Sequence, residues 1–247
     1  MMKCINTLTE QGPHRKKNED AIRHGVNDKL PIHWMIVADG MGGHKAGEVA
    51  SSLLTDFVAE QLNTLSEVPK QGWKSYACEI LKQANSNIYE KSQKFSHYKG
   101  MGTTGVLLIL EQNCCYIAWV GDSRAYIYHK GQLIQLTEDH TMIQFLLNKG
   151  AISAATAANS NTKNLLSRAL GSKVDVEVDI VSRKLYPGDR LMLSTDGLHD
   201  FLSEDEIKHY LGKYIKLDEK NALCKKMVEH AVLQSSKDNL TLGLICL

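Results

Sequence analysis

An apolar run that ends abruptly at an acidic residue occupies residues 32–43, IHWMIVADGMGG. The branched and aromatic residues up to Ala38 are typical of a buried strand, and the Asp39-Gly40 pair that follows marks a turn. A sheet holds an aspartate at a strand end rigidly, and the glycine after it lets a backbone carbonyl approach a cation. The run therefore predicts a buried strand that presents a carboxylate to a metal ion.

Two later runs have the same form, residues 194–197 (STDG) and 237–239 (KDN). The motifs at 15–20 (RKKNED) and 121–124 (GDSR) add further acids. If these carboxylates converge, each pair about 4 Å apart repels by about 4 kcal/mol at an effective dielectric near 20. Bound cations would reverse that penalty, and oxygen ligands suit Mg²⁺ or Mn²⁺. Convergence would therefore imply a metal site.

The composition is that of a globular protein with a large core. The chain has 247 residues, 43% of them hydrophobic, which favours a single domain over 1–247. A formal net charge of +1 gives no reason to expect nucleic acid as a partner. The six cysteines show no Cys-x-x-Cys spacing and fit buried free thiols in a reducing compartment. No apolar segment is long enough to span a membrane, so we expect a cytoplasmic protein without a membrane partner.

Periodicity predicts alternating blocks of helix and strand. Apolar stripes indicate helices over 46–64 and through 73–88, lying side by side across one face of a sheet. Residues 103–136 are expected to form a meander of antiparallel strands with short turns. Strands at 190–195 and 240–246 alternate with helices at 203–212 and 220–235, the first of which carries a capping box of Ser203 and Glu206.

One segment differs in texture from the rest. Residues 151–162 are dominated by Ala, Ser, Thr and Asn, with no apolar period after Ile152. Such composition predicts a mobile surface excursion between ordered segments. We expect it to act as a flap that contributes to substrate selectivity.

Taken together and in order, the motifs resemble the bacterial branch of the metal-dependent Ser/Thr protein phosphatases of type 2C. The resemblance covers nearly the whole chain. It rests on RxxNED at 15–20, DGMGG at 39–43, GTT at 102–104, GDSR at 121–124, LTxDH at 136–140, SRALG at 167–171, STDGL at 194–198 and DN at 238–239.

The resemblance implies an α+β fold, a four-layer α-β-β-α sandwich of two antiparallel sheets flanked by antiparallel helices, with the metals at one end. It also implies the ligands of two core ions and a weaker third, with Mn²⁺ or Mg²⁺ as the cofactor. The first ion would be held by Asp39, Asp196 and Asp238, the second by Glu19, Asp39 and the Gly40 carbonyl, and the third by Asp122 with Asp196. Asp20 and Asn239 would orient metal-bound waters.

The implied chemistry is a direct attack on phosphorus by a water or hydroxide that bridges the two core ions. Arg15 offers a planar fork for two phosphate oxygens. Many eukaryotic relatives have a histidine, proposed as general acid, where this chain has Met41, so the identity of the proton donor stays open. None of the cysteines lies in the Gly- and Arg-rich setting that a thiolate phosphatase requires.

Simpler interpretations exist for several of these residues. An isolated Asp-Gly is more often a turn than a ligand, and Arg15 alone would be read as a solvated charge. His44, His140 and His199 are not assigned to catalysis, because a loop histidine more often hydrogen-bonds backbone. Asp139 is expected to cap the helix that begins near Thr141.

The leading hypothesis is a monomeric phosphatase that acts on phosphoserine and phosphothreonine in proteins and opposes a bacterial Ser/Thr kinase. A catalytically silent sensor domain with the same fold is the alternative from another class, although such domains usually lack the metal aspartates. Hydrolysis of a small phosphorylated molecule is the alternative within the enzyme class. The residues do not choose the physiological substrate, nor between Mn²⁺ and Mg²⁺.

Overall fold

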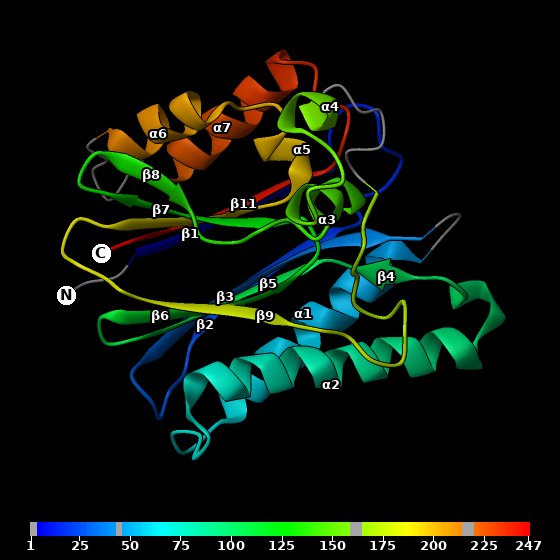
Figure 1. The fold of residues 1–247 in the computed structure, drawn as a ribbon. Helices are drawn as coiled ribbons and strands as arrows, with labels where there is room; N and C mark the ends of the chain where they lie inside the picture. The colour runs from blue at the N-terminus through cyan, green and yellow to red at the C-terminus, as the bar shows by residue number, and fades with distance from the viewer. Residues whose placement is uncertain (1–3, 43–45, 159–164, 214–219) are drawn as a thin grey trace.

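The computed structural model describes residues 4–42, 46–158, 165–213 and 220–247. Two antiparallel sheets pack face to face, and helices cover the outer face of each, which confirms the predicted four-layer sandwich (Figure 1). Branched and aromatic runs make the strands, while stripes with a period of 3.6 residues make the helices that bury one side against them. The order of layers therefore follows from the alternation of these two periods along the chain.

The first sheet joins the two ends of the chain. Its order is β1-β11-β10-β7-β8, with every neighbouring pair antiparallel. Its strands are β1 (Cys4–Glu10), β7 (Arg124–His129), β8 (Gln132–Gln135), β10 (Arg190–Ser194) and β11 (Leu240–Cys246). Pairing of β1 with β11 brings residues more than two hundred positions apart into register, for example Thr9 opposite Thr241.

The second sheet has the order β2-β3-β5-β6-β9, and a short strand, β4, pairs with the end of β3. Its strands are β2 (Asp20–Val26), β3 (Ile32–Met41), β4 (Gly102–Thr103), β5 (Gly105–Glu111), β6 (Cys114–Val120) and β9 (Asp179–Lys184). The strand predicted at 32–38 is β3, which continues to Met41. Register places Asp20 of β2 directly opposite Asp39 of β3, at the end where the candidate site lies.

The two outer layers are helical. In Figure 1, α1 (Gly47–Thr64) and α2 (Gly72–Lys94) lie side by side under the second sheet, as predicted, and a single 3₁₀ turn, η1 (Ser96–Tyr98), follows them. The first sheet is covered by α6 (Glu204–Gly212) and α7 (Lys220–Leu233), with the short α5 (Asp196–His199) beside them. The predicted capping box of Ser203 and Glu206 is present at the start of α6.

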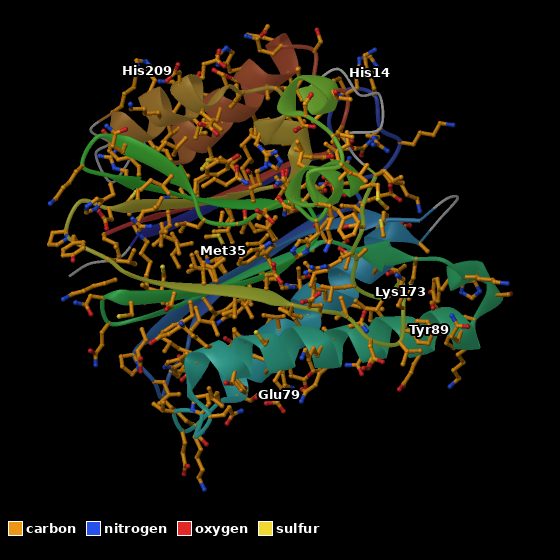
Figure 2. The ribbon with its side chains drawn as sticks, viewed as in Figure 1. His14, Met35, Glu79, Tyr89, Lys173 and His209 are labelled. Carbon is orange, nitrogen blue, oxygen red and sulfur yellow. The ribbon has the colours of Figure 1, made fainter. Side chains whose placement is uncertain are left out.

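Three apolar layers hold the sandwich together: one between each sheet and its helices, and one between the sheets. Met35 points into the middle layer (Figure 2). A Cβ at Gly243 on the facing strand would lie 2.2 Å from the Met35 Sδ atom, so the glycine makes room for this side chain. The close fit fixes how β11 sits over β3, and with it the distance between the two halves of the site.

Two details of the predicted fold are wrong. Residues 103–136 do not form one meander, because β6 belongs to the second sheet and β7 to the first, so the chain crosses between sheets at Gly121-Asp122-Ser123. Asp139 does not cap the helix α3 (Met142–Asn148), since the Thr141 side chain accepts the Gln144 amide proton there. Periodicity predicts strands but carries no information about which sheet each strand joins.

The segment predicted as a flap is only partly within the described residues. Within the expected surface excursion, Ala154–Ala158 forms a short helix, α4, after α3. Residues 159–162 of the segment lie outside the described ranges, and its mobility stays a prediction. None of the six cysteines forms a disulfide, and only Cys115 and Cys224 are buried. Among the described residues, no helix has the length and apolar character needed to cross a bilayer.

Candidate metal centre and active site

A cavity of about 640 Å³ opens at the end of the sandwich where β3 and β10 end and β2 and β11 begin. It collects every site residue predicted from the sequence except Asp20. Its lining is Arg15, Glu19, Asp39, Gly40, Met41, Gly42, Thr104, Asp122, Leu165, Leu166, Asp196, Asp238 and Asn239. Acidic residues from distant parts of the chain therefore face one space, as the sequence predicted.

Asp39 is fixed through its backbone on both sides. Its N–H donates to Thr104 Oγ1 at 2.9 Å, and its carbonyl accepts from Thr103 Oγ1 and from the Thr104 N–H, each at 2.9 Å. These bonds take over where the pairing of β3 with β5 ends at Val37, while Asp39 stays paired with Asp20 of β2. The hydroxyls of the two threonines thus satisfy backbone polar groups of Asp39 at the start of the glycine-rich turn.

Glu19 and Gly40 are held against each other. The Gly40 N–H donates to the Glu19 carbonyl at 3.0 Å, and the Ser51 hydroxyl donates to the same carbonyl at 2.6 Å. A Cβ at Gly40 would lie 2.1 Å from the Gly47 carbonyl oxygen, so only glycine fits between the strand and the start of α1. The close approach keeps the Gly40 carbonyl and the Glu19 carboxylate at the same wall of the cavity.

Asn239 ties the late part of the chain to the early loop. Its Oδ1 accepts the Glu19 N–H at 2.9 Å, and its Nδ2 donates to the carbonyls of Gln11 and Lys17 at 2.6 and 2.9 Å. All polar atoms of this amide are thereby engaged with the 11–19 segment. Asp238, the preceding residue, is brought beside Glu19 as a direct result.

Asp196 stands at the first turn of α5, where β10 has just ended. A Cβ at Gly197 would lie 2.0 Å from the Asn239 carbonyl oxygen, which shows how closely the two turns approach. The Ser236 hydroxyl donates to the Gly197 carbonyl at 2.8 Å and closes this contact from the other side. The turns that carry Asp196 and Asp238 therefore form one packed unit.

Asp20 lies behind the cavity wall. Its side chain is buried and its Oδ2 accepts from the Thr195 hydroxyl at 2.9 Å. Burial raises the pKa of this carboxyl to about 7 against the lowering effect of its hydroxyl donors. Its position beside Asp39 in the register and beneath Asp196 fits a supporting carboxylate better than a direct ligand.

The described residues of the cavity lining carry more negative than positive charge. Burial, reinforced by neighbouring carboxylates, raises the pKa of Asp39 well above its usual range and the pKa of Asp196 to about 6. Burial also raises the pKa of Glu19. One oxygen of Asp196, Oδ1, is buried without a hydrogen-bond partner. Carboxylate oxygens are the ligands that hard divalent cations prefer, so this excess of carboxylates favours binding of such cations.

The carboxylates of the cavity do not converge tightly on a single ion position. Among the described residues, no three His, Cys, Asp or Glu side chains form a group tight enough to hold a metal without adjustment. Like charges in a cavity keep one another apart until a cation is present, so this spacing is the one expected of a metal-free acidic site. The donor set and the orphaned Asp196 oxygen fit divalent cations.

Arg15 is the basic residue of the cavity lining, and it forms an ion pair with Asp238, with its Nη2 atom 2.6 Å from Oδ2. The side chain is 45% exposed, so the guanidinium stands at the mouth of the cavity and not within its wall. The sequence could not settle whether Arg15 was a solvated charge. The structure places it on the carboxylate cluster.

Asp122 faces both the main cavity and a neighbouring recess of about 430 Å³. Burial, with Asp196 as the next contribution, raises its pKa to about 8. Asp200 lines the same recess and adds to the raised pKa of both aspartates. The sequence reasoning missed Asp200, although an aspartate four residues after Asp196 at the start of a helix was a usable signal.

The remaining motif residues have structural partners. Asp139 accepts from the Arg124 guanidinium through both carboxylate oxygens, which replaces the predicted cap by an ion pair. His140 accepts a backbone N–H from Gly121, as expected of a loop histidine. His199 contacts the Ser194 hydroxyl at 3.0 Å, a side-chain partner and not backbone. His44 lies outside the described residues.

Comparison with known proteins gives a consistent result. A family model described as protein phosphatase 2C matches residues 14–230. The serine/threonine phosphatase stp of Listeria monocytogenes serotype 4b is 38% identical over 244 residues, which are 96% of this chain and 93% of that protein. Stp1 from Staphylococcus aureus, a serine/threonine phosphatase of known structure, superposes with a TM-score of 0.91 at 32% identity, covering 100% of this chain and 96% of that one.

A third structure contains metal. The catalytic domain of the protein phosphatase PstP, in complex with two manganese ions, has a TM-score of 0.84 and 29% identity, with 99% of this chain and 97% of that chain covered. The four-layer sandwich with an acidic cavity at one end defines a class of metal-site proteins. Within that class, the chain belongs to the protein phosphatase 2C family.

Proposed function

We propose that this member of the protein phosphatase 2C family hydrolyses phosphoserine and phosphothreonine in proteins by direct attack of water, with divalent cations bound in the acidic cavity. Phosphatase activity follows from family membership, and the names of relatives specify serine and threonine. The observation that carries the proposal is the convergence of uncompensated carboxylates with one guanidinium at the cavity mouth. A silent sensor domain would have no need to retain that arrangement, since it opposes folding when metal is absent.

Asp39 is the proposed bridge between two core ions. Burial, followed by the charges of Asp20, Asp196, Asp122 and Asp238, raises the pKa of Asp39, so four other aspartates lie near it, as expected of a central position. The proposed ligands of one ion are Asp39, Asp196 and Asp238, and those of the other are Glu19, Asp39 and the Gly40 carbonyl. The manganese ions of the PstP structure favour Mn²⁺, with Mg²⁺ as the alternative.

A weaker third ion is proposed in the recess where Asp122, Asp196 and Asp200 meet. Asp122 is held by a strand-to-strand crossover, while Asp200 is exposed at the end of α5. A site with one exposed ligand and a shared one should bind its ion less tightly than the core pair. Asp122 is therefore proposed to support turnover without being needed for the core ions.

When two cations are bound, they lower the pKa of water so that hydroxide is available near neutral pH. The chain's own part is to position and to compensate charge. Arg15 is held by Asp238 in the metal-free protein. If Asp238 held a cation, the Arg15 guanidinium would be available to bind two phosphate oxygens.

Supporting contacts keep the proposed ligands in place. Asp20 and Asn239 are proposed to orient ordered water beside the ions, Asp20 from beneath Asp196 and Asn239 from beside Glu19. Met41 lines the cavity but has no proton to give. We therefore propose that the leaving alkoxide takes its proton from solvent held near Asp122.

The proposed biological setting keeps the expectations from the sequence. The substrates are phosphorylated proteins, the opposing enzyme is a Ser/Thr kinase, and the chain acts as one catalytic domain and as a monomer, with 151–162 as a flap. Leu165 and Leu166, which follow that segment in the sequence, line the cavity and support a substrate-facing role for it. The cytoplasm is the proposed location, since free cysteines fit a reducing compartment.

The test is metal-dependent turnover of a phosphothreonine peptide. Activity should vanish in EDTA and return with Mn²⁺, and it should exceed the turnover of the matching phosphotyrosine peptide. Chelator-resistant turnover would contradict the metal mechanism. Fewer than two bound ions in millimolar Mn²⁺ would favour the silent domain, and a preference for small phosphate esters over the peptide would favour the small-molecule alternative.

A further inference from the structure

His140 lies next to the crossover that carries Asp122, and each of its polar atoms has a partner. It is 5% exposed. Its N–H donates to the Gly121 carbonyl at 2.9 Å, and its carbonyl accepts the Ser167 N–H at 2.8 Å. Its ring Nδ1 accepts the Gly121 N–H at 3.1 Å, and its ring Nε2 lies 3.3 Å from Asp179 Oδ2. One residue thus binds both backbone polar groups of Gly121.

These contacts fix which ring nitrogen carries the proton. Because the Gly121 N–H is a donor, Nδ1 has to be the acceptor, and the proton of the neutral ring therefore lies on Nε2, toward the Asp179 carboxylate. Arg168 donates to the same carboxylate at 3.0 Å. Burial and the nearby Arg168 charge lower the pKa of His140, which favours the neutral ring. Trp119 stacks on the imidazole, with ring centroids 6.1 Å apart, and limits its rotation.

The Gly121 turn has little other support. Gly121 has a φ of +104°, a conformation that L side chains rarely adopt. A Cβ there would lie 2.6 Å from the Thr104 side chain, so the turn is pressed against the residue that accepts the Asp39 N–H. Ser123 closes the far side through a 2.7 Å contact between its hydroxyl and that of Thr104. His140 holds the two peptide groups on either side of Gly121: its ring accepts from the Gly121 N–H, and its backbone N–H donates to the Gly121 carbonyl.

We propose that His140 is a positioning residue for the Asp122 carboxylate, which it orients by clamping Gly121 on both sides: its ring Nδ1 holds the Gly121 N–H, and its backbone N–H holds the Gly121 carbonyl. Asp122 follows Gly121 directly, so rotation about the Gly121 backbone would swing the carboxylate away from the recess it shares with Asp196. The inference rests on the proposed role of Asp122 in turnover. It gives the His of the LTxDH motif a task that an ordinary buried histidine does not have.

Two substitutions separate the ring nitrogens. His140→Asn keeps an acceptor close to the position of Nδ1 but loses the group that faces Asp179. His140→Gln keeps a donor close to the position of Nε2 but loses the acceptor for Gly121. If His140 matters only for packing or for its contact with Asp179, His140→Gln should resemble the unmodified protein more closely than His140→Asn. If it clamps Gly121, His140→Asn should resemble the unmodified protein more closely.

The first readout needs neither metal nor activity. Amide hydrogen exchange of Gly121 in the metal-free protein should be about tenfold faster in His140→Gln than in His140→Asn, which should stay near the unmodified protein. Equal exchange in the two variants, or faster exchange in Asn, would overturn the proposal. If neither variant folds, ¹⁵N NMR of the unmodified protein decides: the proton has to be found on Nε2, and its location on Nδ1 would overturn the clamp.

The second readout is turnover of the phosphothreonine peptide in saturating Mn²⁺. His140→Gln should lower kcat toward the value of Asp122→Ala with KM unchanged, and His140→Asn should recover most of it. If Asp122→Ala lowers kcat but Gln does not, the positioning role is overturned. If Asp122→Ala is fully active while Gly121 exchange still responds as expected, the proposed role of Asp122 is wrong and the clamp itself stands.

Discussion

Asp122 and Asp139 line the same recess, but only Asp139 has a basic partner among the described residues. Asp139 forms an ion pair with Arg124 of β7, whose Nη2 atom lies 2.6 Å from the Asp139 Oδ2 atom. Asp122 has no such partner among the described residues, and burial with Asp196 raises its pKa to about 8. A carboxylate that the protein compensates is part of its framework, whereas one left uncompensated at a cavity wall is prepared for a cation.

The same contrast extends to the main cavity. Among the described residues of the lining, Arg15 is the single cation beside several carboxylates, and it is also about half exposed. Folding this end of the molecule without metal therefore costs electrostatic free energy, which the three apolar layers have to offset. The difference teaches that the acidic end lowers the stability of the fold unless cations compensate its carboxylates.

The largest expected effect comes from Asp39→Asn. Removing the proposed bridge disturbs both core ions and should lower kcat/KM by about a thousandfold or more, since bound metals contribute several kcal/mol of transition-state stabilisation. Asp122→Ala is the matched change and should cost about tenfold to a hundredfold, with two ions still bound. Steady-state kinetics and metal analysis of both variants provide the measurement. Equal residual activity in the two would reject the division of roles.

Breaking the compensated pair should act on stability instead. Arg124→Met leaves the half-buried Asp139 carboxylate without its partner and should destabilise the protein by about 2–4 kcal/mol. Urea unfolding in the presence of EDTA measures this without interference from metal. The double change Arg124→Met with Asp139→Leu is the control, and it should recover most of the loss. A single mutant as stable as the unmodified protein would show that the pair is not the framework contact inferred here.

The metal-free protein should become less stable as pH rises from about 7 to about 9. Asp122 has a folded pKa of about 8 and Asp39 one raised well above its usual range, against about 3.9 when unfolded. A carboxyl group whose pKa is higher in the folded than in the unfolded state stabilises the fold at low pH. That contribution is lost as pH rises through the pKa of the folded state. Buried His140 and His199, whose pKa values are lowered, act in the opposite sense but only below about pH 6.5.

Thermal unfolding in EDTA should therefore show a midpoint that falls by several degrees across this range, since about 1 kcal/mol shifts it by about 2–4 °C in a protein of this size. Saturating Mn²⁺ should abolish the fall, because the cations compensate the ionised carboxylates. Asp122→Asn is the control and should flatten part of the slope. A midpoint independent of pH in EDTA would mean that the cavity carboxylates are not strained by their burial.

The smallest expected effect is that of Arg15→Lys. Lysine can keep the ion pair with Asp238 but cannot offer two parallel donors to a phosphate. KM for the phosphothreonine peptide should rise by about tenfold, while the unfolding midpoint of the metal-free protein stays the same. An unchanged KM would show that Arg15 serves only to compensate Asp238. Arg15→Met, which removes both roles, should raise KM further and alter the midpoint as well.

Residues whose role depends on local pattern were predictable. The strand before Asp39, the stripes of α1 and α2, and the capping box at Ser203 are all set by neighbours within one or two turns of chain. The family resemblance then ordered the acids into one site, and the cavity lining contains all of them but Asp20. Asp200 was missed because it lies outside the STDGL motif, although its spacing of four residues from Asp196 was a usable signal.

The sequence by itself determined the periods, the caps and the chemical character of the acidic turns, because these depend on residue type and short-range spacing. Only the tertiary structure decided that the GDSR turn crosses between sheets, that Asp139 pairs with Arg124, and that Asn239 binds the 11–19 segment. Each of these depends on contacts between distant segments. Their free energy comes from the packing of the two sheets, exemplified by Met35 against Gly243, and no local pattern encodes it.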